Sequence, residues 1–181
     1  NLPIEEAKKM GYLSHQADTC GLHVHVNRTT FGNTENEQEA AIARVLYFFE
    51  KFWEELLKFS RRTQRQLDHW AARYGYKEKP KDILDHAKGH NSAGRYTAVN
   101  LTNRDTVEFR MFRGTLKYNT LIATLELLDN ICEMAVYLTD KDVQGLSWTS
   151  FVVGCTQPEL VQYLKERRLY VNDAVASEED V

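Results

Sequence analysis

Two long stretches of this 181-residue chain carry apolar residues at helical spacing, and they restrict the possible folds more than any other feature. The first begins near Asn33 or Thr34, either of which can cap a helix, and runs to about Arg62. The second, from about Thr120 to Leu138, is apolar most of the way round. Helices of this kind must pack against another layer of structure. We therefore expect both to lie in one core.

Three shorter stretches predict strands. Residues 20–27, CGLHVHVN, alternate between apolar and polar side chains, which is typical of a half-buried strand. Residues 95–101 and 106–115, separated by the turn-like TNRD, predict an antiparallel hairpin. Together with the helices they predict an α+β fold, in which an antiparallel sheet has a polar concave face and the long helices pack on its other face. We expect one domain over residues 1–170 and a flexible acidic tail over 171–181.

Composition excludes several classes of protein. The net charge is −3, from 26 acidic and 23 basic residues, which argues against a nucleic-acid-binding protein. No apolar run approaches the roughly 20 residues that span a bilayer. Cys20, Cys132 and Cys155 form no CxxC pair, so neither a disulfide scaffold nor a zinc knuckle is indicated. We expect a cytoplasmic protein.

The stretch from Lys58 to Lys81 is basic, with eight lysines or arginines against Asp68 and Glu78. A solvated helix end followed by a loop accounts for it. The alternative interpretation, secondary to that one, is a basic rim that attracts an anionic ligand.

The strand at 20–27 places His23 and His25 on one face, opposite Leu22, Val24 and Val26. Side chains two residues apart on a strand face lie roughly 7 Å apart, so both imidazoles can reach one metal ion or one polyphosphate. Taken alone, the pair is equally consistent with two partly exposed surface histidines.

The strand at 106–115 places Glu108, Arg110 and Phe112 on one face. A cross-strand salt bridge is one interpretation. The other is a metal-binding Glu108 beside an Arg110 that binds anionic oxygen. Arg95, which follows a glycine-containing loop, is either a surface residue or a phosphate clamp. If the strands share a sheet, His23, His25, Glu108 and Arg110 converge, and Mg²⁺ with nucleotide phosphates would satisfy all of them.

The motifs CGLHVHV, RYTAVNL and VEFRMFRGTLK, in this order, resemble those of the amidoligase family of phages and bacteria. That family belongs to a superfamily of carboxylate–amine ligases that includes glutamine synthetase and glutamate–cysteine ligase. The resemblance spans about Cys20 to Leu138. It implies part of a glutamine-synthetase-like catalytic domain that uses ATP and Mg²⁺ (or Mn²⁺) to join a carboxylate to an amine through an acyl phosphate.

The resemblance also implies a role for each matching residue. His23 resembles a ligand of the metal ion beside the ATP phosphates, and His25 a residue lying along the nucleotide. Arg95 resembles an arginine that contacts phosphate. Glu108 resembles the metal-ligating glutamate of the catalytic strand, and Arg110 the arginine that steadies the phosphate during transfer.

The front of the chain departs from this pattern. The superfamily supplies an alternating acidic pair from an earlier strand, whereas Glu5 and Glu6 are adjacent and lie in a helix-like stretch. We therefore expect either the later part of a longer enzyme or a member that binds without turnover. The expected partners are small-molecule or peptide carboxylates and amines, and an exposed strand edge favours a homodimer.

Two other functions stay open from the residues alone. One is a metal-dependent hydrolase in which His23 and His25 chelate the metal and Glu108 activates water. The other is a non-catalytic module whose polar face and basic stretch bind an acidic partner.

Overall fold

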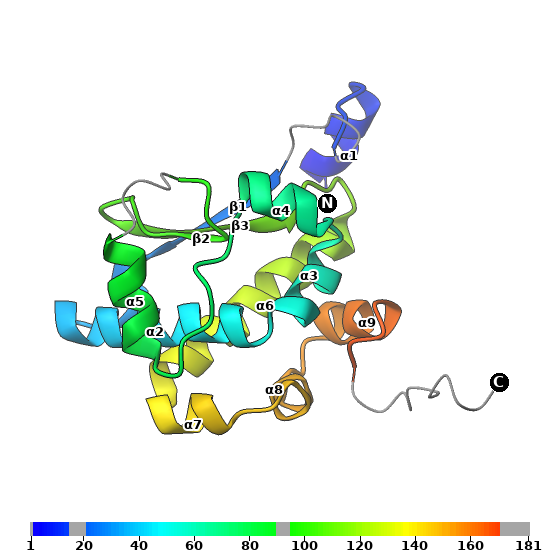
Figure 1. Cartoon of the computed structure of the whole chain (residues 1–181). Helices are drawn as coiled ribbons and strands as arrows, with labels where there is room; N and C mark the ends of the chain where they lie inside the picture. The colour runs from blue at the N-terminus through cyan, green and yellow to red at the C-terminus, as the bar shows by residue number, and fades with distance from the viewer. Residues whose placement is uncertain (1, 15–20, 90–94, 171–181) are drawn as a thin grey trace.

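The computed structural model describes residues 2–14, 21–89 and 95–170, and it confirms the α+β class (Figure 1). Within those ranges, an antiparallel sheet is formed by β1 (Gly21–Asn27), β2 (Val99–Asn100) and β3 (Thr106–Arg113), in the order β1-β3-β2. The predicted acidic tail, Cys20 and much of the glycine-containing loop before Arg95 lie outside the described residues.

The remaining elements are helical and account for most of the described chain. They are α1 (Leu2–Lys9), the 3-10 helix η1 (Arg28–Phe31), α2 (Glu35–Lys51), α3 (Trp53–Ser60), α4 (Gln64–Trp70), α5 (Pro80–Gly89), α6 (Tyr118–Tyr137), α7 (Asp140–Gly145), α8 (Trp148–Gly154) and α9 (Pro158–Glu166). No described helix is long and apolar enough to cross a bilayer.

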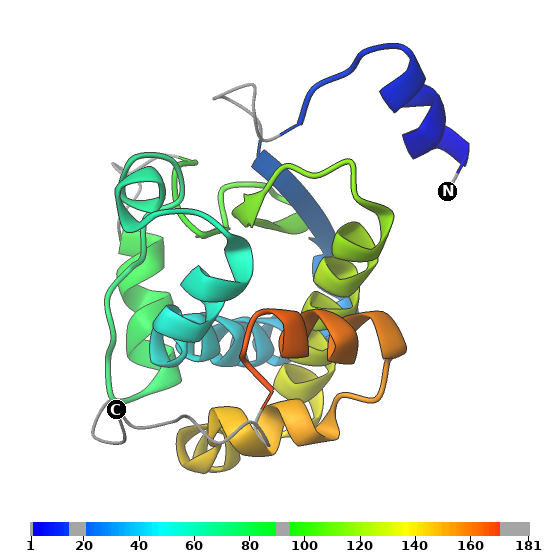
Figure 2. The same ribbon diagram turned by 90° about the vertical axis from the view of Figure 1, so that its right-hand side faces the viewer.

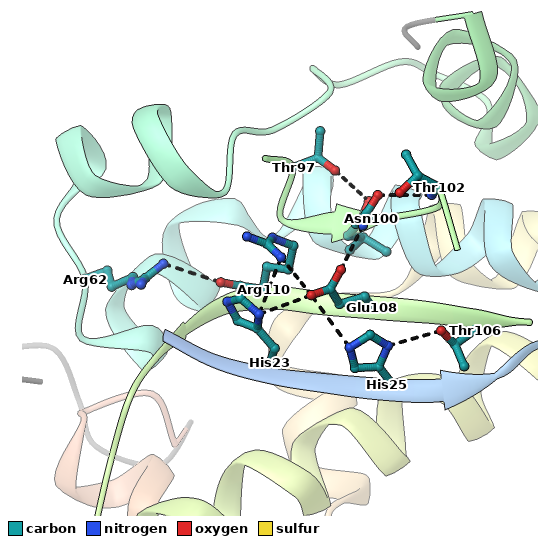
Figure 3. A network of polar contacts seen from close by, with 10 residues as sticks. His23, His25, Arg62, Thr97, Asn100, Thr102, Thr106, Glu108 and Arg110 are labelled. Carbon is teal, nitrogen blue, oxygen red and sulfur yellow. Dashed lines mark hydrogen bonds and ion pairs between the residues drawn. The ribbon is translucent and has the colours of Figure 1, made fainter. Parts of the chain in front are cut away.

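The sheet lies on a helical layer formed mainly by α2, α3 and α6 (Figure 1). Phe109 of β3 packs against Phe49 of α2, with 5.6 Å between ring centroids. α9 packs against α6 and lies beside α3, whereas α7 and α8 lie farther from the sheet (Figure 2). The opposite face of the sheet carries the polar side chains of His23, His25, Glu108 and Arg110 (Figure 3). Helix α4 lies beside that face (Figure 1).

The first predicted helix is interrupted once. It begins as expected, with Thr34 in a capping box with Glu37. It then bends at Phe52, and α3 ends at Ser60, close to the predicted end, with Arg61 as its cap at a left-handed φ of 59°. The apolar pattern does not predict this bend, because Phe52 at the bend and Trp53 directly after it are both buried.

A β-bulge changes the alternation of β3. Leu22 pairs with Phe112 but Val24 pairs with Phe109, so β3 has one residue more than β1 between these pairs. The prediction that Phe112 shares a face with Glu108 was therefore wrong. Phe112 packs in the core against Phe59 of α3, with ring centroids 6.0 Å apart.

The hairpin forms as predicted, but its first strand is short. Val99 pairs with Phe109, and Asn100 with Glu108. Before this strand, Thr97 forms a parallel bridge with Ala72. The segment that follows α4 is thereby held beside the polar face of the sheet.

Candidate functional site

Four of the predicted site residues converge on the polar face (Figure 3). His25 lies opposite Glu108 in the β1/β3 pair. Oε1 of Glu108 lies 3.1 Å from Nδ1 of His23 and 3.7 Å from Nε2 of His25. The same oxygen accepts a hydrogen bond of 2.7 Å from Nη1 of Arg110. The convergence that was predicted from strand alternation is thus present.

Glu108 is 6% exposed, and both its oxygens have partners. Asn100, also buried, donates from Nδ2 to Oε2 of Glu108 at 2.8 Å and is itself held by the backbone N–H of Thr102. Burial acts to raise the pKa of Glu108, but the hydrogen bonds from Asn100 and Arg110 outweigh it, and the pKa is lowered. Glu108 is therefore ionised at neutral pH.

Arg110 is nearly as buried, at 7% exposed, yet its Nε has no hydrogen-bond partner in the described structure. Its guanidinium lies 5.8 Å from the centroid of the Tyr96 ring. Arg62 approaches from the end of α3 and donates from Nη1 to the backbone carbonyl of Arg110 at 3.4 Å. A buried N–H without a partner is a donor that a bound ligand can satisfy.

A cavity of about 190 Å³ opens over these groups. The side chains of His23, Arg62, Arg95 and Arg110 line it together with two aromatic rings, those of Trp70 and Tyr96, and with the backbone of Gly21. No carboxylate is among the lining residues. Neither Arg62 nor Arg95 forms an ion pair with a carboxylate in the described part of the chain. A small cavity with three guanidinium groups attracts anions.

Gly21 allows these groups to crowd together. A Cβ atom at this position would lie 2.9 Å from Nη2 of Arg62 and 3.1 Å from Nε2 of His23. A larger residue would require the tip of Arg62 or the ring of His23 to shift.

The ring of Tyr96 contacts two of the arginines that line the cavity. The guanidinium of Arg95 lies 5.5 Å from its ring centroid, on a ring that also contacts Arg110. Trp70 meets Tyr96 edge to face at 5.6 Å and is 42% exposed. Trp70 therefore offers a free ring surface at the mouth of the cavity.

The two histidines differ in their surroundings. Burial, followed by the charge of Arg110, lowers the pKa of His23 below its usual value of 6.5, against the opposing effect of Glu108. His25 is hydrogen-bonded through Nδ1 to the hydroxyl of Thr106 at 3.1 Å. His23 lines the cavity, whereas His25 is not among the residues that line it.

Within the described part of the chain, the same side chains do not form a complete metal site. No group of three or more His, Cys, Asp or Glu side chains is placed to bind a metal within residues 2–14, 21–89 and 95–170. Both imidazoles approach one oxygen of Glu108, but Arg110 already donates to that oxygen. These residues suit an anion better than a bare metal ion, and the metal-ligand roles of His23 and Glu108 stay predictions.

Several residues of the site were not identified from the sequence as site residues: Arg62, Trp70, Tyr96 and Asn100. Arg62 had a signal, because it lies in the basic stretch 58–81 for which an anion-attracting rim was one interpretation. Tyr96 and Asn100 lie in the motif RYTAVNL, which pointed to this segment without singling them out. Nothing in its spacing links Trp70 to β1.

A comparison with protein families matches residues 4–132 to the family described as "putative amidoligase enzyme". No curated protein and no solved structure matches the chain. The matched range contains every residue of the site described above, including the His–x–His strand and the Glu–x–Arg strand. This chain therefore belongs to the amidoligase family.

Proposed function

We propose that this protein is an ATP- and Mg²⁺-dependent carboxylate–amine ligase. A carboxylate oxygen of the acid attacks the γ-phosphorus of ATP, the bond to the β-phosphate oxygen breaks, and ADP leaves. The amine then attacks the carbonyl carbon of the acyl phosphate. It displaces inorganic phosphate, loses a proton and forms the amide. The substrates are a small-molecule or peptide carboxylate and an amine.

The observation that carries the proposal is the cavity lined by Arg62, Arg95 and Arg110 without a lining carboxylate. A chain with a net charge of −3 concentrates three guanidinium groups in about 190 Å³. Catalysis of phosphoryl transfer consists mostly of positioning and charge stabilisation, which arginines supply. The cavity supports binding of a polyphosphate, and family membership supports an amide-forming reaction.

Each side chain has a task in this reaction. Arg110 is held rigidly by Glu108 and binds phosphate oxygens through its unpartnered Nε. Arg62 and Arg95, which also line the cavity, neutralise the remaining charge. Trp70, at the mouth, provides a ring against which the base can stack.

Mg²⁺ is proposed to arrive with the nucleotide. This ion is commonly bound by one or two carboxylates together with substrate phosphates and water, so a single ionised Glu108 with His23 beside it is a compatible protein contribution. When bound, the ion would neutralise phosphate charge during transfer. The described residues do not by themselves favour the hydrolase alternative, which needs a metal site without nucleotide.

The test measures nucleotide binding, which does not require the unidentified acid and amine. We expect ATP with Mg²⁺ to raise the melting temperature of the wild-type chain and to bind in isothermal titration calorimetry. The double variant Arg62→Gln/Arg95→Gln should bind at least about 100-fold more weakly, because each charged hydrogen bond contributes about 1.5–3 kcal/mol.

The matched control is Arg65→Gln/Arg104→Gln, which removes the same charge from exposed positions outside the cavity. It should bind like the wild type, apart from a small long-range charge effect. Equal losses in both double variants would show that only net charge matters. That result, or no binding by the wild type at millimolar nucleotide, would contradict the proposal.

A further inference from the structure

A second cavity, of about 240 Å³, lies beyond the end of β3, among α3, α6 and α9. Figure 2 shows these three helices side by side. They are in contact, since Tyr163 of α9 donates its hydroxyl to the carbonyl of Phe59 in α3 at 3.1 Å. The cavity is somewhat smaller than the roughly 300–1,000 Å³ of drug-sized sites and suits a ligand the size of an amino acid.

The walls of this cavity are apolar at one side and basic at the other. Phe59, Phe112 and Leu116 supply apolar surface. Arg61 and Arg113 supply positive charge, and neither forms an ion pair with a carboxylate in the described ranges. Such a combination recognises a molecule with an apolar body and an anionic end.

One buried hydroxyl in the wall has no partner. Thr120, in the first turn of α6, is 7% exposed, and its Oγ1 makes no hydrogen bond in the described structure. The hydroxyl of Thr124, one turn later, is in contrast satisfied by the carbonyl of Thr120 at 2.8 Å. An unpaired buried hydroxyl is destabilising, so its presence in a cavity wall points to a ligand that would pair with it.

The two cavities are lined in part by neighbouring residues. Arg61 lines the second cavity and the next residue, Arg62, lines the first. Likewise, Arg113 of the second cavity is paired across the sheet with Gly21 of the first. The left-handed φ of 59° at Arg61 turns the chain between these two positions. A group bound at Arg61 and Arg113 is therefore next to the proposed phosphate site.

We propose that the second cavity binds the acid substrate, and that this acid is an amino-acid-sized carboxylate with an apolar body. The role of this acid as a substrate rests on the proposed ligase function, whereas its binding to the cavity does not. The body lies against Phe59, Phe112 and Leu116. The carboxylate lies at Arg61 and Arg113, beside the proposed phosphate site, where phosphorylation requires it.

The probe is 3-phenylpropanoate, and its neutral counterpart is 3-phenylpropanamide. Binding to the wild-type chain is measured by titration calorimetry and by saturation-transfer NMR, without nucleotide. We expect the acid to bind at least about tenfold more tightly than the amide, because charged hydrogen bonds to arginine are lost in the amide. Arg113→Gln should lose about the same factor, whereas Arg104→Gln, an exposed arginine outside the cavity, should lose nothing.

Thr120→Val tests the hydroxyl separately from folding. If Oγ1 is unpaired in the free protein, valine should leave the melting temperature unchanged or raise it, while probe binding weakens severalfold. A lower melting temperature with unchanged binding would assign Thr120 a structural role and contradict the proposal.

The two proposals can fail independently. No binding of the acid to the wild type, or equal binding of acid and amide, would overturn the second site even if ATP binds. Acid binding that depends on Arg113 without any ATP binding would keep the site and overturn the ligase.

Discussion

Two buried glutamates, Glu50 of α2 and Glu108 of β3, differ in what surrounds them. They are 5% and 6% exposed, and each is paired with an arginine. Nε of Arg73 lies 2.8 Å from Glu50, and Nη1 of Arg110 lies 2.7 Å from Glu108. By burial and pairing alone the two sites would be judged equivalent.

The Glu50 site is complete. One carboxylate oxygen accepts from Arg73 and the other from the backbone N–H of Tyr74 at 2.7 Å, while Arg73 also donates to the carbonyl of Glu50. The guanidinium of Arg73 stacks over Trp53 at 5.0 Å. Within the described residues, no buried polar atom of this pair lacks a partner. The ion pair ties the segment after α4 to α2 and has a structural role.

The Glu108 site is incomplete. Two imidazoles and Arg110 approach a single oxygen, Nε of Arg110 lacks a described partner, and a cavity with two more arginines lies beside it. A buried ion pair facing a cavity with unused donors indicates a binding site, whereas a fully satisfied one indicates stability.

The largest effect is expected at the structural site. Glu50→Ala should lower the free energy of unfolding by about 3 kcal/mol, the lower end of the cost of breaking a buried pair, because Arg73 is 36% exposed and can reach water. Chemical denaturation measures it. Nucleotide affinity of the folded variant should match that of the wild type, and a large loss of affinity would mean that the two glutamates do not have separate roles.

At the cavity we expect a smaller effect, which changes nucleotide affinity rather than stability. Arg110→Lys keeps a positive charge beside Glu108 but loses the planar fork that binds phosphate oxygens. Nucleotide affinity should fall about tenfold or more, while the free energy of unfolding changes by less than about 1 kcal/mol. Calorimetric titration and denaturation measure the two values. A variant that unfolds readily but binds normally would make Arg110 structural, like Arg73.

Lowering the pH should destabilise the protein through protonation of His23 and Glu108. The folded-state pKa of His23 lies below 6.5, so the unfolded chain binds the proton first, and stability falls as pH drops from about 6.5 toward that folded pKa. Glu108, whose pKa lies below 4.5, adds a second loss at lower pH. His23→Asn should remove the first loss, and the exposed His69→Asn should not. Midpoints of chemical unfolding, measured across this pH range for the wild type and both variants, test this prediction. Stability that rises as the pH falls through 6.5 would contradict a lowered pKa of His23.

The smallest expected effect is a shift in the pKa of His23. Burial and the charge of Arg110 lower the pKa of His23, and a bound anion should raise it again by favouring the imidazolium form. NMR titration of the histidine signals with and without pyrophosphate measures this. An unchanged His23 pKa at saturating pyrophosphate would place the anion away from His23.

Strand alternation is local, and it was enough to place His23 with His25 on one face of a strand and Glu108 with Arg110 on one face of another. Away from a β-bulge, side chains on a strand alternate between its two faces, so these pairings follow from the order of residues. The α+β class and the cap at Thr34 follow in the same way from spacing and from a capping box. The motif order also pointed to the amidoligase family, which the match over residues 4–132 confirms.

Other features depend on contacts between segments far apart in sequence. The bulge that moves Phe112 into the core depends on how β3 pairs with β1, and the bend at Phe52 keeps Phe52 and Trp53 buried. Arg62 enters the site only because the chain turns at Arg61 beside the end of the sheet.

The order of residues alone therefore determined which side chains share a strand face and which helices must be buried, because periodicity is a property of neighbours in the chain. Only the tertiary structure decided that one buried glutamate is a structural anchor and the other borders a cationic cavity. That distinction depends on whether every donor finds a partner, and the partners come from elements that the sequence separates by tens of residues.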